Sequence, residues 1–205
     1  MNRGQIRAAA VTKLRIPSSG DGLLTSPTLN DLINESLRKI SRERLWPWLL
    51  TSANLTVATT GIAALPADFV EADTLIYDSA PVAWAGLHEL LMSGNRYVWA
   101  DDGTNVRVEP APSASITMTL WYYRTDPDLA TDASTPLMPA GHHDLIAIET
   151  AHLAALLRHD PDQAASWSGQ YERELVNMVK AAFRKRGDVK VARRRDRRQW
   201  TARWP

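Results

Sequence analysis

Hydrophobic residues repeat with two different periods along this chain, and the change of period predicts where helices give way to strands. Residues 5–14 are rich in alanine and predict a short helix. In residues 26–44, leucine and isoleucine recur at helical spacing on one face, with Ser26 at the N-cap position and Pro27 at the first helical position. The motif Trp46-Pro47-Trp48 ends this helix, because proline disfavours the α conformation in the residue before it.

From residue 49 to residue 124 the pattern changes to an alternation of apolar and polar positions, which is typical of half-buried strands. The alternation is clearest at residues 53–57 and 116–122. Asp102-Gly103 separates two short apolar runs and predicts a hairpin. We expect about five or six short strands here, with one or two helical turns at residues 87–92.

Two further helices are predicted in the C-terminal half. Residues 144–158 are apolar around most of the helix circumference, so this helix needs cover on several sides. Asp160-Pro161 ends it, and a helix of about 26 residues follows to about Arg186, with Trp167 and Tyr171 on its apolar stripe.

These elements predict an α+β fold: a helical bundle from the N- and C-terminal helices, with an inserted small antiparallel β region and an extended C-terminal arm. The expected domains are N-terminal helices at 1–48, a β-rich insertion at 49–125, a helix pair at 126–187 that completes the helical core, and a basic docking arm at 188–205.

The net charge of +1 conceals three regions of different sign. Residues 1–44 carry +4, residues 45–179 carry −12 and residues 180–205 carry +9. A basic tail on an acidic body predicts a partner with an acidic surface, or a nucleic acid backbone. Cysteine is absent, which excludes disulfides and thiolate metal sites. The apolar runs are short, so we expect neither a signal peptide nor a membrane span.

Motifs for metal binding and catalysis are incomplete. His88-Glu89 resembles the start of a zinc-protease motif, but Met92 occupies the position of the second ligand. His142-His143-Asp144 could bind a metal, although an acid such as Asp144 is also favoured in the first turn of a helix. We therefore expect no enzymatic activity, no cofactor and no metal. An active site assembled only by folding stays an alternative.

The segment after Gly187 combines arginines with two tryptophans. A solvated tail, direct contact with nucleic acid and docking on a protein all fit its charge. Docking is favoured, because tryptophan and arginine are enriched at the energetic centres of protein interfaces. The predicted docking residues are Arg193, Arg194, Arg195, Arg197, Arg198, Trp200, Arg203 and Trp204.

Several short motifs occur in an order that resembles the head-to-tail connector (adaptor) proteins of tailed bacteriophages. The resemblance covers residues 5–186. Its motifs are Leu29 to Glu35, Trp46 to Trp48, Leu65 to Phe69, Arg107 to Pro112, Thr119 to Arg124 and Thr135 to Pro139.

The resemblance implies a virion protein that forms a ring, commonly of twelve copies, beneath the portal and lines the channel for DNA. Expected partners are the portal protein, a tail or next connector protein, further copies of the chain and the genomic DNA that passes through, with no membrane. The protein would be made in the host cytoplasm and reside at the head-tail interface. Residues expected in subunit packing are Trp46, Trp48, Glu149, Trp167 and Tyr171. The alternative is a non-enzymatic DNA-binding module that uses its basic arm.

Overall fold

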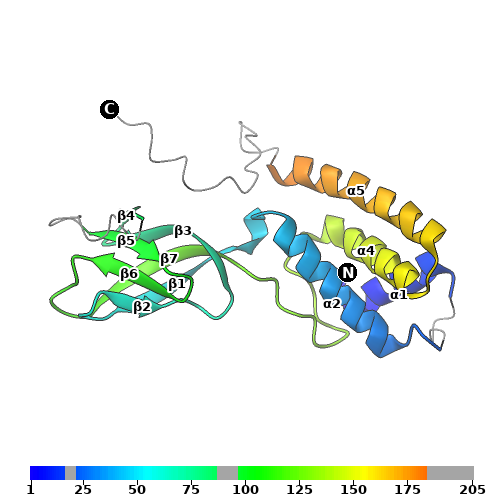
Figure 1. Ribbon diagram of the computed structural model, residues 1–205, viewed down its shortest axis with the longest axis horizontal. Helices are drawn as coiled ribbons and strands as arrows, with labels where there is room; N and C mark the ends of the chain where they lie inside the picture. Colours follow the sequence, from blue (N-terminus) through cyan, green and yellow to red (C-terminus); the bar gives the residue numbers. More distant parts are fainter. Residues whose placement is uncertain (17–21, 87–96, 184–205) are drawn as a thin grey trace. The chain divides into compact units, whose positions relative to one another are not determined.

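A computed structural model describes residues 1–16, 22–86 and 97–183, which form two compact units (Figure 1). Among the described residues, the helical unit contains those within Met1–Pro47 and residues 126–183, and the β unit contains those within Trp48–Thr125. The predicted docking arm and the helical turns expected at residues 87–92 lie outside the described residues.

The helical unit begins with α1 (Arg3–Leu14) and α2 (Ser26–Glu43). The side chain of Asn2 accepts a hydrogen bond from the backbone N–H of Gln5, whose side chain accepts one from the N–H of Asn2, so α1 starts with a capping box. Thr25, rather than Ser26 as expected, is the N-cap of α2. The shift is one residue, and Pro27 still lies in the first turn, where it removes no intrahelical hydrogen bond.

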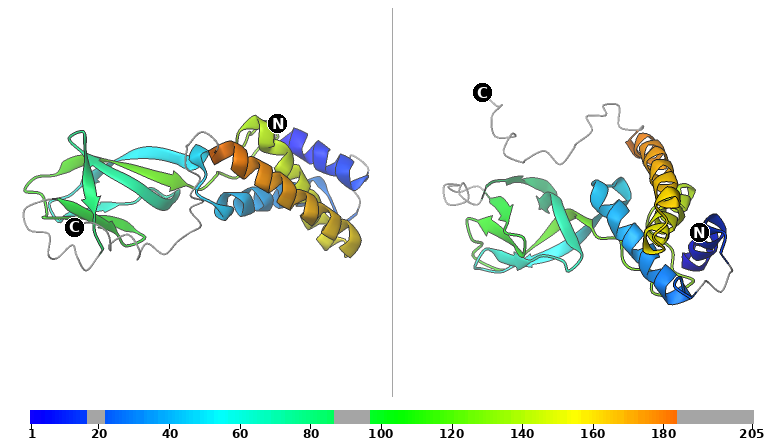
Figure 2. Two further views of the ribbon diagram at one scale, coloured as in Figure 1. Left: turned by 90° about the horizontal axis from the view of Figure 1, so that it is seen from above. Right: turned by 45° about the vertical axis from the view of Figure 1, so that its right-hand side comes forward.

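Helix α4 (His143–Leu157) is the centre of this unit. It follows a short turn of 3₁₀-helix, η2 (Ala140–His142), and is buried along most of its length. Helices α1, α2 and α5 (Pro161–Phe183) all pack on it, as Figure 2 shows for the yellow-green helix. The prediction that this apolar helix needs cover on several sides is thus confirmed.

After a short 3₁₀-helix, η1 (Pro47–Leu49), the described part of the β unit contains seven strands. Their order across the sheet is β1-β7-β3-β4-β5-β6-β2, and every pair is antiparallel except β4 with β5. The strands are β1 (Leu50–Val57), β2 (Ile62–Ala64), β3 (Phe69–Tyr77), β4 (Ala80–Trp84), β5 (Val98–Asp101), β6 (Asn105–Glu109) and β7 (Ile116–Arg124).

A tight turn brings the two outer strands of this sheet together. In the β1–β2 turn, the N–H of Gly61 donates to the carbonyl of Ala58 at 2.9 Å. The N–H of Val108, in β6, then donates to the carbonyl of Gly61 at 2.7 Å. The sheet is therefore curled into a nearly closed barrel, and its interior is filled by side chains such as Leu75, Trp99 and Leu120.

The predicted fold was wrong about the β region. It is not a small antiparallel insertion in a helical bundle, because its seven strands enclose a hydrophobic core of their own and include a parallel pair. The protein is a mixed α+β structure with a barrel-like sheet. Two irregularities between Phe69 and Thr74 shift the register of β3 against β7 and interrupt the alternation from which strands are predicted. Two further strands have weak sequence signals, because β2 has only three residues and β4 contains a proline, Pro81.

Candidate functional site on the helical unit

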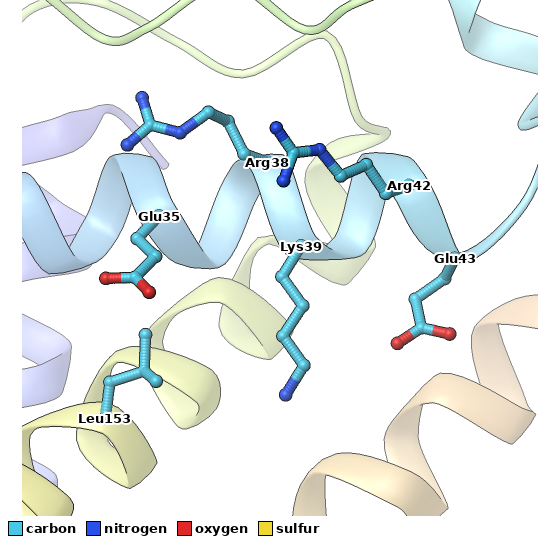
Figure 3. Close-up of a pocket in the computed structure, with 6 residues that line it drawn as sticks. All are labelled: Glu35, Arg38, Lys39, Arg42, Glu43 and Leu153. Carbon is cyan, nitrogen blue, oxygen red and sulfur yellow. The ribbon is translucent and has the colours of Figure 1, made fainter.

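An open groove of about 440 Å³ lies on the helical unit (Figure 3). Five charged side chains of α2 line it together with one apolar side chain of α4. The lining residues are Glu35, Arg38, Lys39, Arg42, Glu43 and Leu153. No described helix combines the length and the apolar composition needed to span a membrane.

The periodicity of α2 sets the direction of these side chains. Leu29, Ile33 and related apolar residues face the core, which leaves the charged positions for the outside of the helix. Glu35, Lys39 and Glu43 are four residues apart, so they follow one another along a single face of α2. In Figure 3 these three point toward α4 and α5, whereas the arginines point to the other side of α2.

Lys39 connects three helices at the floor of the groove. Its Nζ donates a hydrogen bond of 2.7 Å to Oε1 of Glu149 in α4 and lies 4.8 Å from the ring centroid of Tyr171 in α5. Nδ1 of His152 is 3.3 Å from the same Oε1. The side chain of Glu149 has 0% exposure, whereas that of Lys39 is 41% exposed. The ion pair therefore joins a wholly buried carboxylate to an ammonium that water can reach.

Two buried polar atoms close to this pair have no hydrogen-bond partner in the part of the chain that the structure describes: Oε2 of Glu149 and the hydroxyl of Tyr171. The pKa of the Tyr171 phenol is raised, first because burial disfavours the phenolate and then because Glu43 and Glu149 are negatively charged neighbours. Both atoms lie beneath a groove whose acids Glu35 and Glu43 belong to no ion pair among the described residues. Of the charged side chains that line the groove, three are cationic and two are acidic, and two of the cations already belong to ion pairs.

Three further ion pairs in the described helical unit hold the segment that precedes η2, through Asp128 and Asp132. Arg38 donates to both carboxylate oxygens of Asp128, at 2.7 and 2.8 Å. Asp132 accepts hydrogen bonds from Arg3 and Arg7 of α1. These bonds, from Arg7 first and then Arg3, lower the pKa of the Asp132 carboxyl. This segment is therefore held on the helices by charge as well as by packing.

The predicted packing residues occupy different positions. Glu149 and Tyr171 meet at Lys39, as described. Trp46 is buried in the helical unit, where its Nε1 donates to the carbonyl of Ile40 at 2.7 Å. Trp167 is half-buried on α5, with Nζ of Lys13 5.9 Å from its ring centroid. Trp48 is also half-buried, and it belongs to the β unit.

Sequence analysis missed Lys39 and Glu43, although the spacing of four residues from Glu35 to Lys39 to Glu43 was a usable signal. Of the histidine cluster, Asp144 forms an ion pair with Lys13 at 3.1 Å. Within the described residues, no group of three or more histidine, aspartate or glutamate side chains is placed to hold a metal ion.

Comparison with known proteins identifies the family. The family model described as SU10 adaptor protein matches residues 1–201. No curated protein matches the chain. The resemblance to phage adaptor proteins that the sequence motifs carry is therefore confirmed over nearly the whole chain, and a structural role in the virion follows from it. The chain belongs to the SU10 adaptor protein family, and it is a bacteriophage head-tail adaptor.

Proposed function

We propose that this adaptor forms a ring of twelve identical subunits beneath the portal, with the basic arm of each subunit docked on the portal protein. The ring joins the DNA-filled head to the tail or to the next connector protein, and it surrounds the DNA channel. Its role is structural, without catalysis, cofactor or metal.

The separation of charge along the chain supports this proposal most strongly. Residues 45–179 carry −12, whereas residues 184–205 contain ten basic and two acidic residues together with Trp200 and Trp204. Helix α5 ends at Phe183, whose ring stacks on that of Trp46 with 6.3 Å between the centroids. The basic segment therefore starts from a fixed point on the helical unit and is well suited to bind an acidic partner.

Ring formation requires each subunit to present two different surfaces, since a closed ring of identical subunits is built from heterologous contacts. Among the predicted packing residues, Trp48 and Trp167 keep exposed surface and are proposed to contact the neighbouring subunits. Trp46, Glu149 and Tyr171 lie inside the helical unit and are proposed to shape that surface from within.

The acidic body fits a position around moving DNA. Double-stranded DNA is a dense line of negative charge, and a protein that binds its phosphates must supply cations. A body with a net charge of −12 over residues 45–179 supplies few, so we propose that the channel wall does not retain the genome as it passes.

The docking function is tested by two classes of arm variant, measured as binding of the purified adaptor to portal-bearing heads. Replacing both Trp200 and Trp204 by alanine is expected to weaken binding by at least about tenfold, because a buried indole contributes about 2 kcal/mol or more at an interface. The single variant Arg193→Gln is expected to weaken it by less than about fivefold, as for an exposed ion pair. Equal effects would contradict docking through the indoles.

A second candidate is a DNA-binding module without a ring, because the ten basic residues after Phe183 would also bind phosphates. It predicts that the chain binds duplex DNA with an affinity that falls steeply with salt, as counterions are released. Binding that is absent, or that does not change with salt, would exclude this candidate.

A further inference from the structure

We infer that, in the free subunit, the groove on α2 is a binding site for the chain's own basic arm, residues 184–205. The segment is held there by ion pairs with Glu35 and Glu43. Insofar as the arm docks on the portal, as proposed above, the groove keeps it covered until assembly.

The first support is the place where the described chain ends. Glu43 is the last residue of α2 and lines the groove, and Trp46 follows it by three residues. Phe183, the last residue of α5, stacks on Trp46 at 6.3 Å between ring centroids, with 28° between the ring planes. The arm therefore starts beside the Glu43 end of the groove.

The second support is length. From Glu35 to Glu43 the groove follows about 12 Å of helix. The 22 residues after Phe183 can extend to about 70 Å, so they reach every part of the groove with a large margin. A tethered segment also has an effective concentration in the millimolar range or above near its attachment point, so weak contacts suffice to hold it there.

The third support is the way in which the charges of the groove are already paired. Arg38 is bound to Asp128, and Lys39 is bound to Glu149. The exposed acids Glu35 and Glu43 have no ion pair among the described residues. The carboxylates of Glu35 and Glu43 are therefore available to a cation that enters the groove, whereas Arg38 and Lys39 already bind acids of the same unit.

The third cation of the groove, Arg42, is exposed, and in Figure 3 its guanidinium points to the opposite side of α2 from Glu35 and Glu43. Leu153 adds a half-buried apolar surface from α4, against which an indole can pack. Next to Lys39, the carboxylate of Glu149 has one oxygen without a hydrogen-bond partner among the described residues. An arginine-rich segment with tryptophans can pair with the carboxylates of Glu35 and Glu43 and pack an indole against Leu153.

The natural absence of cysteine allows a direct test with the full-length, free protein. One cysteine replaces Leu153 in the groove and a second replaces Gln199 in the arm. After mild oxidation, an intramolecular disulfide gives a faster-migrating monomer on a non-reducing gel, and an intermolecular one gives a dimer. In the matched control, the groove cysteine is moved to Gln163, an exposed position at the start of α5.

The inference predicts an intramolecular yield at least about fivefold higher for the groove pair than for the control pair, owing to the raised local concentration. Reversing the charge at Glu35 and Glu43 with lysine is expected to remove the difference, whereas the same change at Glu172 and Glu174 on exposed α5 positions is expected to preserve it. Circular dichroism of each variant checks that the helices are intact.

Equal yields for the two cysteine pairs would overturn the inference. So would a groove pair that forms only dimers, because the groove would then take the arm of a second copy. The test contains no heads, so it can fail while docking on the portal is confirmed, and it can succeed while portal docking fails.

Discussion

The ammonium of Lys39 lies 2.7 Å from Oε1 of Glu149, and only the lysine has access to water. The pair joins α2 to α4, and Tyr171 of α5 covers the ammonium from a third side at 4.8 Å. The side chain of Lys39 is 41% exposed and that of Glu149 is 0% exposed, so removing one charge does not cost the same free energy as removing the other. A buried charge that loses its partner is much more costly than a charge that can turn toward solvent.

This asymmetry gives the first prediction. Glu149→Gln is expected to lower the free energy of unfolding by about 1 kcal/mol, since Lys39 can then be hydrated. Lys39→Met is expected to lower it by about 3 kcal/mol, because the carboxylate of Glu149 stays buried after losing its ion pair and keeps the contact with His152. Urea unfolding at neutral pH measures both, with Lys180→Met at an exposed position as control. Equal losses for the two variants would contradict this description of the pair.

The second prediction concerns Trp46, which fixes the end of α5 to the end of α2. Trp46→Ala is expected to destabilise the protein by about 3–5 kcal/mol, as for other wholly buried aromatic residues. Trp46→Phe keeps most of the packing but loses the hydrogen bond to Ile40, which predicts a loss of about 1–2 kcal/mol. The control, Trp121→Phe, changes a residue that is 39% exposed and should have little effect. A similar loss for Trp46→Phe and the control would argue against the hydrogen bond.

Closure of the barrel gives the third prediction, through two glycines with positive φ. Gly61 has φ +74°, and a Cβ at this position would lie 2.5 Å from the carbonyl oxygen of Val108; Gly103 has φ +86° and open space. Gly103→Ala should cost only the backbone strain, about 1 kcal/mol. Gly61→Ala should lower the free energy of unfolding by at least about 2 kcal/mol more, because the backbone carbonyl of Val108 must move away from the new Cβ. Thermal unfolding measures the melting temperatures of the two variants. Equal decreases in melting temperature would show that a Cβ at position 61 does not clash with β6.

A fourth prediction uses the hairpin between β5 and β6. Asp102 accepts hydrogen bonds from the backbone N–H groups of Asn105 and Thr104 and from the side chain of Arg107. These bonds lower the pKa of the Asp102 carboxyl from 3.8 to about 2, and the bond from Asn105 has the largest effect. A lowered pKa in the folded state means that this contribution to stability is present above about pH 4 and is lost as the pH falls toward about 2. Hydrogen exchange of the hairpin amides measures it.

The variant Asp102→Asn is expected to exchange faster than the parent at pH 6, with the difference disappearing near pH 2. Asp78→Asn, at an exposed turn outside this hairpin, serves as the matched control. A difference between Asp102→Asn and the parent that persists at pH 2 would show that the charge of the carboxylate is not what holds the turn.

The helices could be predicted because their signals are local. The apolar period of α2 and the nearly continuous apolar sequence of α4 are both read within a single segment, and both helices were predicted to within a few residues. The barrel could not be predicted in this way. Its closure depends on pairs far apart in the chain, such as Ser52 with Trp121, and on Gly61 approaching Val108.

The site shows the same division between local and distant information. Glu149 could be singled out from sequence, because it interrupts an otherwise apolar helix. Its partner Lys39 is 110 positions away and looks like any other exposed lysine of an amphipathic helix. Only the packing of α2 on α4 brings the two charges together, so the groove is visible in the structure and not in the sequence.

The central claim is that the basic arm, and not the folded body, attaches the adaptor to the head. It is tested most directly with a chain that ends at Gly187, which retains every described element of both units. We predict that this truncated protein keeps the helical content and thermal stability of the parent but no longer binds portal-bearing heads in a sedimentation assay. Truncated protein that sediments with heads to the same extent as the full-length chain would contradict the account.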